Sequence, residues 1–348
     1  MGDVQVIVLR AAGINCDEEA VYAWRLAGAK PALVHINTLA RNPEMLNDYH
    51  IVTIPGGFSY GDDIAAGTIL AQRIVYDLAE PLRGMVRRGG GILGICNGFQ
   101  VLVKAGLLPG CEVDTRPGHA RDASARQVTV TFNDSAKFEA RWVCLRICAE
   151  HCVYLTTNPG RTRGGGGMDP GDPELRRGTT DGGSPADSLY PSDRERVPAV
   201  FPHGEGERPV HEPSDCPLGS DPRGLVAHSE SDEANTDSSR FLEMPVEHAE
   251  GKVVTASDEV TRRLDVSGCV ALRYVDAQGR YDRYPANPNG SVGGIAGLCD
   301  PTGRILGLMP HPDRHFDRMH HPQWTRRSPV GPPDGLKLFQ NAVRYWSA

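Results

Sequence analysis

Short apolar runs alternate with longer amphipathic stretches along the first third of the chain. The runs at 4–9, 31–37, 49–57 and 91–96 are rich in Val and Ile, which is typical of buried strands. The stretches at 17–29, 67–89 and 98–108 place their apolar residues at helical spacing. Strands that alternate with helices predict an α/β fold with a mostly parallel sheet flanked by helices.

This pattern stops between residues 157 and 239, where Gly, Pro, Ser, Asp and Arg dominate. Such a composition cannot bury enough apolar surface to offset the chain entropy lost on ordering. We therefore expect 157–239 to be a low-complexity, mostly disordered insertion. The residues on either side, 1–156 and 240–348, would form a single domain. A hidden second domain within the insertion is the alternative.

Order returns near residue 240. The segments 252–256 and 270–276 are predicted strands, and 284–312 is a hairpin-like run of strand, Pro-Thr-Gly turn and strand. The segment 334–346 is a predicted closing helix. Its apolar positions fall at helical spacing: Leu336, Phe339, Val343 and Trp346.

Charge and terminal sequence limit the class of protein. The 348 residues carry a formal net charge of −7, which argues against a general nucleic-acid surface. The first ten residues lack the basic region of a signal peptide, and no apolar run approaches the length of a membrane span. We expect a cytoplasmic protein with nine reduced cysteines, which binds neither nucleic acid nor membrane.

Three cysteines at a spacing of four raise the question of a metal site. Cys144, Cys148 and Cys152, with His151 beside the last, would line one face if the segment were helical. The segment is rich in β-formers, and no C-x-x-C pair occurs in the chain. We favour ordinary buried thiols and predict no metal site and no bound cofactor.

The segment Gly94-Ile95-Cys96-Asn97-Gly98 joins a predicted strand to a predicted helix and has the form G-x-nucleophile-x-G. A sharp turn of this kind exposes the nucleophile in a strained conformation, and glycines prevent clashes with its neighbours. The helix N-terminus and the N–H of Asn97 would stabilise a thiolate and an oxyanion. Cys96 is therefore a candidate nucleophile, and a buried strand-end cysteine is the alternative.

A nucleophilic thiol needs a base and a group that orients the base. His311 ends a predicted strand, and Asp313 lies two residues further, on the same face of an extended chain. Gly56 and Gly57 follow another strand and leave backbone N–H groups unobstructed, so they are candidate oxyanion donors. Each pattern alone also has a non-catalytic interpretation, because H-x-D often occurs by chance and a glycine pair often marks an ordinary tight turn.

Taken together, the segments resemble the class I (triad) glutamine amidotransferases, and more closely the glutaminase subunits of phosphoribosylformylglycinamidine synthase. The resemblance covers most of the chain outside the insertion. The motifs that carry it are GINCDEEAVYAWRLAGA (13–29), IPGGFSYGDDIAAG (54–67), GILGICNGFQVLVKAGLLPG (91–110), RWVCLRI (141–147), YPANPNGS (284–291), IAGLCDPTGRILGLMPHPDR (295–314) and GLKLFQNAV (335–343).

The resemblance implies a role for each candidate residue. Cys96 would be the nucleophile, His311 the general base and Asp313 the orienting acid. The oxyanion hole would be formed by Gly57 and the backbone at Asn97, and Gln100 would help to hold the substrate glutamine. The implied reaction is hydrolysis of glutamine to glutamate and ammonia through a cysteine thioester.

Three departures from the family pattern stand out. The family usually has Glu where this chain has Asp313, which is one methylene shorter. The family string HGEG occurs at 203–206, inside the insertion, and as HAEG at 248–251, where a strand-like segment follows. We favour 248–251 as the equivalent. The insertion itself is foreign to the compact family pattern.

No phosphate-binding loop occurs in the chain, so the acceptor chemistry would lie on another polypeptide. The resemblance implies a large synthetase subunit that uses ATP and Mg²⁺, and a small third subunit in some systems. Two other classes remain: a partner-independent thiol hydrolase or peptidase of related fold, and a non-catalytic binding subunit.

Overall fold

The computed structural model describes residues 3–110, 127–156, 240–326 and 331–348. The expectations for the insertion at 157–239, including a hidden second domain, lie outside these residues, as does the HGEG string at 203–206. Within the described residues the strands form two sheets.

A nine-stranded mixed sheet has the order β2-β1-β3-β4-β11-β10-β9-β6-β7, and β5 pairs with β8 in a separate two-stranded sheet. The strands are β1 (Gln5–Arg10), β2 (Lys30–His35), β3 (Ile51–Ile54), β4 (Gly91–Ile95), β5 (Val128–Thr131), β6 (Glu139–Ile147), β7 (Phe241–His248), β8 (Lys252–Thr255), β9 (Val270–Val275), β10 (Ile295–Cys299) and β11 (Ile305–Leu308). From β2 to β11 the pairings are parallel, and from β11 to β7 they are antiparallel. The predicted parallel sheet is confirmed in the first half.

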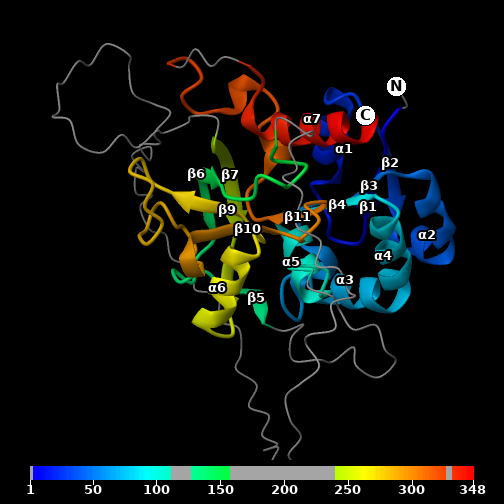
Figure 1. Ribbon diagram of the computed structural model, residues 1–348, viewed down its shortest axis with the longest axis horizontal. Helices are drawn as coiled ribbons and strands as arrows, with labels where there is room; N and C mark the ends of the chain where they lie inside the picture. The colour runs from blue at the N-terminus through cyan, green and yellow to red at the C-terminus, as the bar shows by residue number, and fades with distance from the viewer. Residues whose placement is uncertain (1–2, 111–126, 157–239, 327–330) are drawn as a thin grey trace, which may run out of the picture. The chain divides into compact units, whose positions relative to one another are not determined.

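Helices cover both faces of the parallel half (Figure 1): α1 and α7 lie on one side, and α3, α4 and α5 lie on the other. Their bounds are α1 (Asp17–Leu26), α2 (Ile36–Arg41), α3 (Thr68–Arg73), α4 (Ala79–Arg87), α5 (Asn97–Lys104), α6 (Asp258–Val266) and α7 (Asp334–Ser347). The side chain of Trp24 joins the layers. Its indole N–H donates to Thr53 Oγ1 at 2.8 Å, and its ring packs edge-on against Phe339. These contacts fix α1 and α7 over the centre of the sheet.

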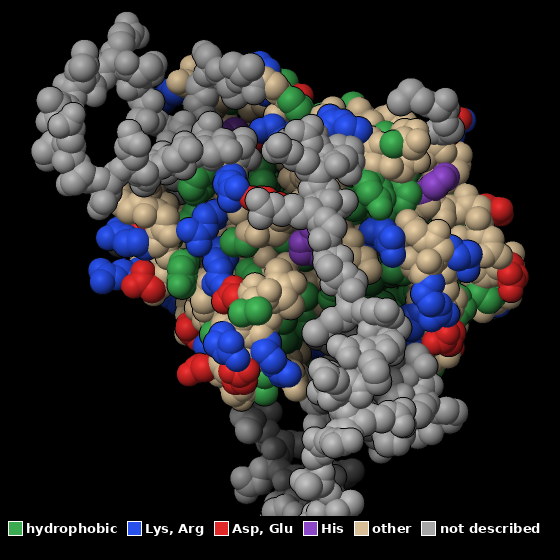
Figure 2. Space-filling view, in the orientation of Figure 1, with side chains coloured by type: hydrophobic (Ala, Val, Ile, Leu, Met, Phe, Trp, Pro, Cys, Tyr) green, Lys and Arg blue, Asp and Glu red, His purple; other side chains and the backbone are tan. Residues whose placement is uncertain are grey.

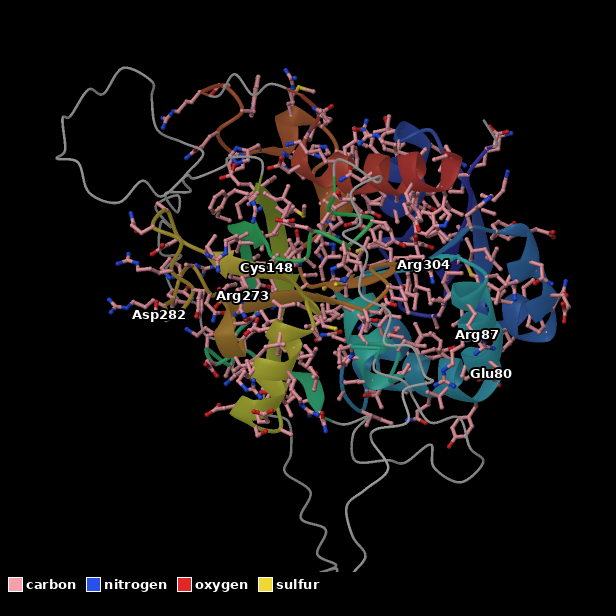
Figure 3. All side chains as sticks on the ribbon, viewed as in Figure 1. Glu80, Arg87, Cys148, Arg273, Asp282 and Arg304 are labelled. Atoms are coloured by element: carbon pink, nitrogen blue, oxygen red, sulfur yellow. The ribbon has the colours of Figure 1, made fainter. Side chains whose placement is uncertain are left out.

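Two predicted elements differ in the structure. The single helix expected at 67–89 is interrupted between α3 and α4 by a π-helical segment, Ile74–Leu78. Pro81 has no N–H to give to a preceding carbonyl, so the regular ladder cannot continue unchanged into α4. Glu80 and Arg87 then pair on the exposed side of α4 at 3.2 Å (Figure 3). The strand expected at 31–37 ends at His35, because His35 Nδ1 accepts from the N–H of Asn37 and α2 begins.

Among the described residues, no helix combines the length and the apolar character that crossing a membrane requires. On the face shown in Figure 2, Lys and Arg side chains are interspersed with Asp and Glu side chains.

Candidate active site

The candidate residues converge where four parallel strands end. Strands β1, β3, β4 and β11 are consecutive in the sheet and run parallel to one another. Cys16 lies in the turn after β1, Gly56 and Gly57 follow β3, Cys96 follows β4, and His311 comes shortly after β11. Active groups of parallel α/β sheets gather at this edge.

Cys96 has the strained conformation predicted for the elbow. Its φ of 51° and ψ of −105° lie outside the regions that L-residues prefer, at a cost of about 1–3 kcal/mol. A Cβ added to Gly98 would lie 1.9 Å from Ile54 O, and one added to Gly94 would lie 2.7 Å from Gly98 O. Only glycine fits either position, so the two glycines allow α5 to pack directly against the strands.

Backbone hydrogen bonds bring His311 to Cys96. Strands β4 and β11 pair in parallel up to Ile95 and Leu308, and the N–H of Cys96 donates to Leu308 O at 2.8 Å. The N–H of His311 donates to Pro245 O in β7, also at 2.8 Å. These hydrogen bonds fix the backbone of Cys96 beside β11 and the backbone of His311 beside β7.

Asp313 contacts the imidazole of His311 in the buried interior. The Nδ1–Oδ1 distance is 3.2 Å, and because an ionised carboxylate only accepts, Nδ1 carries the proton. Burial disfavours the charged ring, but the charges of Cys96 and Asp313 and hydrogen bonds to both raise the pKa of His311 to about 10. Nε2 is then the ring nitrogen that faces the thiol of Cys96. The shorter acid found here thus reaches the ring.

The thiol of Cys96 is largely buried, and its sulfur lies 3.5 Å from the carbonyl oxygen of Glu247. It also stands at the N-terminus of α5, where the first backbone N–H groups have no partner within the helix. These N–H groups and the helix dipole favour negative charge at the sulfur and on an oxygen bound beside it.

The backbone of Gly56 and Gly57 lies directly beside the site, where a side chain would not fit. A Cβ added to Gly56 would lie 2.7 Å from His311 Cε1, and Gly57 has a φ of 129°. A Cβ at Gly57 would also lie 2.7 Å from the backbone nitrogen of Asn15. The geometry places bare backbone next to Cys96 and His311, where the predicted oxyanion donors would have to be.

Asn97 and Gln100 bond to neighbouring protein groups. Asn97 Nδ2 donates to Gln100 Oε1 at 2.9 Å, and Asn97 Oδ1 accepts from the N–H of Ser59 at 3.3 Å. Gln100 Nε2 donates to Glu250 O. Both side chains therefore tie α5 to surrounding loops, and the role of Gln100 in holding glutamine stays a prediction.

The string at 248–251 lies beside α5. The Glu250 carboxylate accepts from the N–H of Ala66, and the carbonyl of Gly251 accepts from Asn289 Nδ2 at 2.8 Å. These bonds join 248–251 to two motifs, 54–67 and 284–291, which sequence analysis had only related by resemblance. The placement supports 248–251 as the equivalent of the family string.

His248 is a buried neutral base in this string. Its Nδ1 lies 3.0 Å from Asn133 Oδ1, and that oxygen also accepts from the N–H of Gly251. Because Asn133 Nδ2 donates to two carbonyls, Oδ1 must accept and His248 Nδ1 must donate. Burial, together with the nearby charge of His311, lowers the pKa of His248 to about 3.

The oxidation state of one cysteine differs from the expectation that all nine are reduced. Cys144 is disulfide-bonded, so the prediction of nine reduced thiols is wrong for that residue. Cys148 is exposed and Cys152 is buried. Among the described residues, the close grouping of potential metal ligands comprises Cys16, His311 and Asp313, and it does not include the segment around His151.

Three further groups line the site, and no local pattern in the sequence indicates a role for them. Cys16 Sγ is 3.2 Å from Arg314 Nη2, and Arg314 pairs with the Glu247 carboxylate. Cys16 and Arg314 stand within the quoted motifs, but β7, which carries Glu247, was not predicted as a strand. Their proximity depends on strand order, which local patterns do not encode.

A thiol on a strained strand–helix turn, beside an imidazole and a carboxylate, is the side-chain arrangement of cysteine-dependent α/β hydrolases and amidotransferases. The chain belongs to the family of CobB/CobQ-like glutamine amidotransferase domains, whose model matches residues 3–162 and 224–346.

Within this family, the chain is similar over nearly its full length to subunits of one synthase. The chain is 33% identical over 346 residues to the phosphoribosylformylglycinamidine synthase subunit PurQ of Dehalococcoides mccartyi, covering 99% of this chain and 98% of the relative. It is 32% identical to the PurQ subunit of Archaeoglobus fulgidus, covering 99% and 97%. The fold matches a chain of the solved structure of PurLQS from Thermotoga maritima, with a TM-score of 0.54, 23% identity and coverage of 99% and 100%.

Proposed function

We propose that this chain is the glutaminase subunit of phosphoribosylformylglycinamidine synthase. The observation that carries the proposal is the strained Cys96 elbow held next to His311, in a chain that matches relatives of that name over nearly its full length. The chain hydrolyses glutamine to glutamate and ammonia. A synthetase then uses the ammonia to make formylglycinamidine ribonucleotide from formylglycinamide ribonucleotide in purine biosynthesis.

Acylation begins with the Cys96 thiolate attacking the side-chain carbonyl carbon of glutamine. The new oxyanion accepts hydrogen bonds from backbone N–H groups at Gly57 and Asn97. The C–N bond then breaks, and His311 Nε2 gives its proton to the leaving nitrogen, which departs as ammonia. Asp313 supports this step by holding Nδ1, so that Nε2 faces the reacting atoms.

Deacylation uses the same groups in reverse. The neutral imidazole of His311 takes a proton from water while the water oxygen attacks the γ-glutamyl thioester. The C–S bond breaks, glutamate leaves, and Cys96 returns to the thiolate paired with imidazolium. One glutamine and one water give one glutamate and one ammonia.

Because this chain only releases ammonia, the reaction that consumes the ammonia requires partner subunits. We infer a large synthetase subunit, which binds ATP, Mg²⁺ and the nucleotide, and a small third subunit, in line with the Thermotoga maritima complex named PurLQS. We expect the assembly to work in the cytoplasm. Neither alternative class has support of comparable weight, because the relatives named above are synthase subunits over their full length.

Covalent labelling tests the proposal. A chloroketone analogue of glutamine should alkylate Cys96, as mapped by peptide mass spectrometry, and excess glutamine should protect it. The matched control is Cys299, a buried thiol elsewhere in the fold, which should stay unlabelled. Adducts at Cys16 or Cys299 with Cys96 free would reject the assignment. Partner-independent turnover of peptides would favour the peptidase class instead.

A further inference from the structure

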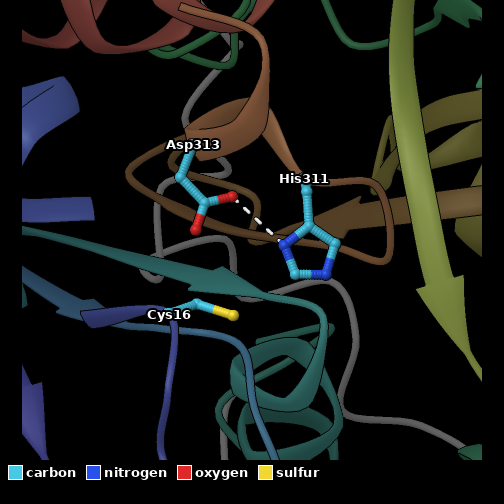
Figure 4. A group of neighbouring side chains, drawn as sticks. All are labelled: Cys16, His311 and Asp313. Carbon is cyan, nitrogen blue, oxygen red and sulfur yellow. Dashed lines mark hydrogen bonds and ion pairs between the residues drawn. The ribbon is translucent and has the colours of Figure 1, made fainter. Parts of the chain in front are cut away.

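The catalytic imidazole of His311 belongs to a cluster of three buried side chains (Figure 4). The nearest ligand atoms of Cys16, His311 and Asp313 all lie within 4.8 Å of one another. They come from distant parts of the chain: Cys16 from the turn after β1, and the other two from the segment after β11. A thiol, an imidazole and a carboxylate form a ligand set that suits Zn²⁺.

One atom of the cluster lacks a partner. Asp313 is fully buried, and its Oδ2 makes no hydrogen bond within the part of the chain that the structure describes. The other oxygen is used by His311. In Figure 4 the free oxygen points toward the side on which Cys16 lies. An unpaired buried carboxylate oxygen is costly, and a bound cation would satisfy it.

We propose that Cys16, His311 and Asp313 bind one Zn²⁺ ion in an inhibitory site. With metal–ligand bonds of about 2.0–2.3 Å, tetrahedral geometry needs ligand atoms separated by about 3.3–3.6 Å. The Asp313 carboxylate lies close to this separation from Nδ1: Oδ1 is 3.2 Å away, and a turn of the carboxylate would bring Oδ2, the oxygen without a partner, to the ion. Because the ligand atoms lie within 4.8 Å of one another, the sulfur would have to approach by about 1.5 Å at most. Water completes the fourth position.

Charge balance favours the ion despite a nearby cation. The Cys16 thiolate and the Asp313 carboxylate together neutralise Zn²⁺, so the buried complex carries no net charge. Arg314 Nη2 lies 3.2 Å from Cys16 Sγ, and its own charge is offset by pairing with the carboxylates of Glu247 and Glu19. Burial and the nearby carboxylate of Asp313 nevertheless raise the pKa of the Cys16 thiol to about 12, so the ion has to displace the thiol proton when it binds.

Binding at Nδ1 would stop catalysis without touching Cys96. The ion replaces the thiol proton of Cys16 and the Nδ1 proton of His311, and both protons go to solvent. Nε2 then keeps its own proton permanently, since a neutral imidazole has one proton for two nitrogens. His311 can no longer accept a proton from water in deacylation. The metal site is independent of the proposed function, and only its inhibitory effect rests on it.

Cobalt spectroscopy tests the site without relying on activity. Co²⁺ added to the full-length Cys96→Ala protein should give a near-ultraviolet sulfur-to-cobalt charge-transfer band at one equivalent, and Zn²⁺ should remove it. The band should be lost in Cys96→Ala/Cys16→Ala and kept in Cys96→Ala/Cys299→Ala. Cys299 is the matched control, because this buried thiol also lies near an imidazole, that of His151, at 3.8 Å. Cys16→Ser replaces the alanine variant if thermal unfolding shows that the alanine variant is not folded.

Inhibition gives the second readout. The Zn²⁺ concentration for half-inhibition of glutaminase, with each variant normalised to its own rate, should rise at least about tenfold in Cys16→Ser and stay unchanged in Cys299→Ser. A cobalt band that survives loss of Cys16 would overturn the site. Unchanged inhibition in Cys16→Ser, with the band lost, would overturn the inhibitory role, and zinc would then act at Cys96. Absence of glutaminase activity in every variant, with the band intact, would instead reject the proposed function.

Discussion

Cys96 and His311 meet because the strands that precede them pair in register. Ile95 lies opposite Leu308, and the N–H of Cys96 continues the ladder onto Leu308 O at 2.8 Å. The imidazole pKa is raised to about 10 by the neighbouring thiol and carboxylate, although burial opposes this. The parallel half of the sheet thus places a thiol and its neighbouring imidazole side by side.

Replacing Asp313 by Asn should shift the pH profile of glutamine hydrolysis. Asp313 favours the charged imidazolium, so its loss lowers the pKa of His311 below about 10. The imidazolium is present below that pKa and is lost as the pH rises through it. The alkaline limb of kcat should therefore move to lower pH, and kcat should fall by about 10²–10⁴-fold.

The matched control is Asp313→Glu, which keeps the charge and restores the acid usual in the family. It should retain the alkaline limb near that of the wild type and most of the activity. An Asp313→Asn profile with its limb unmoved would show that the carboxylate does not act on His311.

Gly98→Ala should destabilise the fold, because the new Cβ would lie 1.9 Å from the carbonyl oxygen of Ile54. Neither backbone can yield without moving α5 from the sheet, so we expect a loss of about 3 kcal/mol or more in the free energy of unfolding. Urea unfolding measures the change.

Gly84→Ala serves as the matched control for Gly98→Ala. Gly84 lies inside α4, and an added Cβ would meet only flexible arginine side chains at 3.3 Å or more. Alanine should stabilise the helix there by up to about 1 kcal/mol. Equal effects of the two substitutions would contradict the close approach at Gly98.

Local pattern was sufficient for the elements that carry the chemistry. The G-x-C-x-G string predicted the turn at Cys96, and H-x-D at a strand end predicted the contact between His311 and Asp313. The break at Ile74–Leu78 was missed because its apolar spacing continues that of a helix. Cys16 and Glu247 were missed because only the strand order of the sheet brings them to the site.

His248 should make folding stability depend on pH. Its folded pKa, about 3, lies below the ordinary value of 6.5, so the unfolded chain binds a proton first. Stability from this group is complete above about pH 6.5 and is lost as the pH falls toward 3. The loss should approach about 1.4 kcal/mol per pH unit.

His248→Asn removes this ionisation while its amide can still donate to Asn133 Oδ1. Urea unfolding between pH 6.5 and 4.5 should show a shallower dependence than in the wild type. His320→Asn, at an exposed histidine, is the control and should keep the wild-type slope. Identical slopes for His248→Asn and the wild type would contradict a neutral buried imidazole.

The most direct test of the central claim compares two nitrogen sources in the reconstituted synthase. With Cys96→Ala, synthesis of formylglycinamidine ribonucleotide from glutamine should disappear, while synthesis from added ammonia should continue at the wild-type rate. Loss of both activities would mean that Cys96 supports the assembly, and persistence of glutamine-dependent synthesis would mean that another group attacks glutamine.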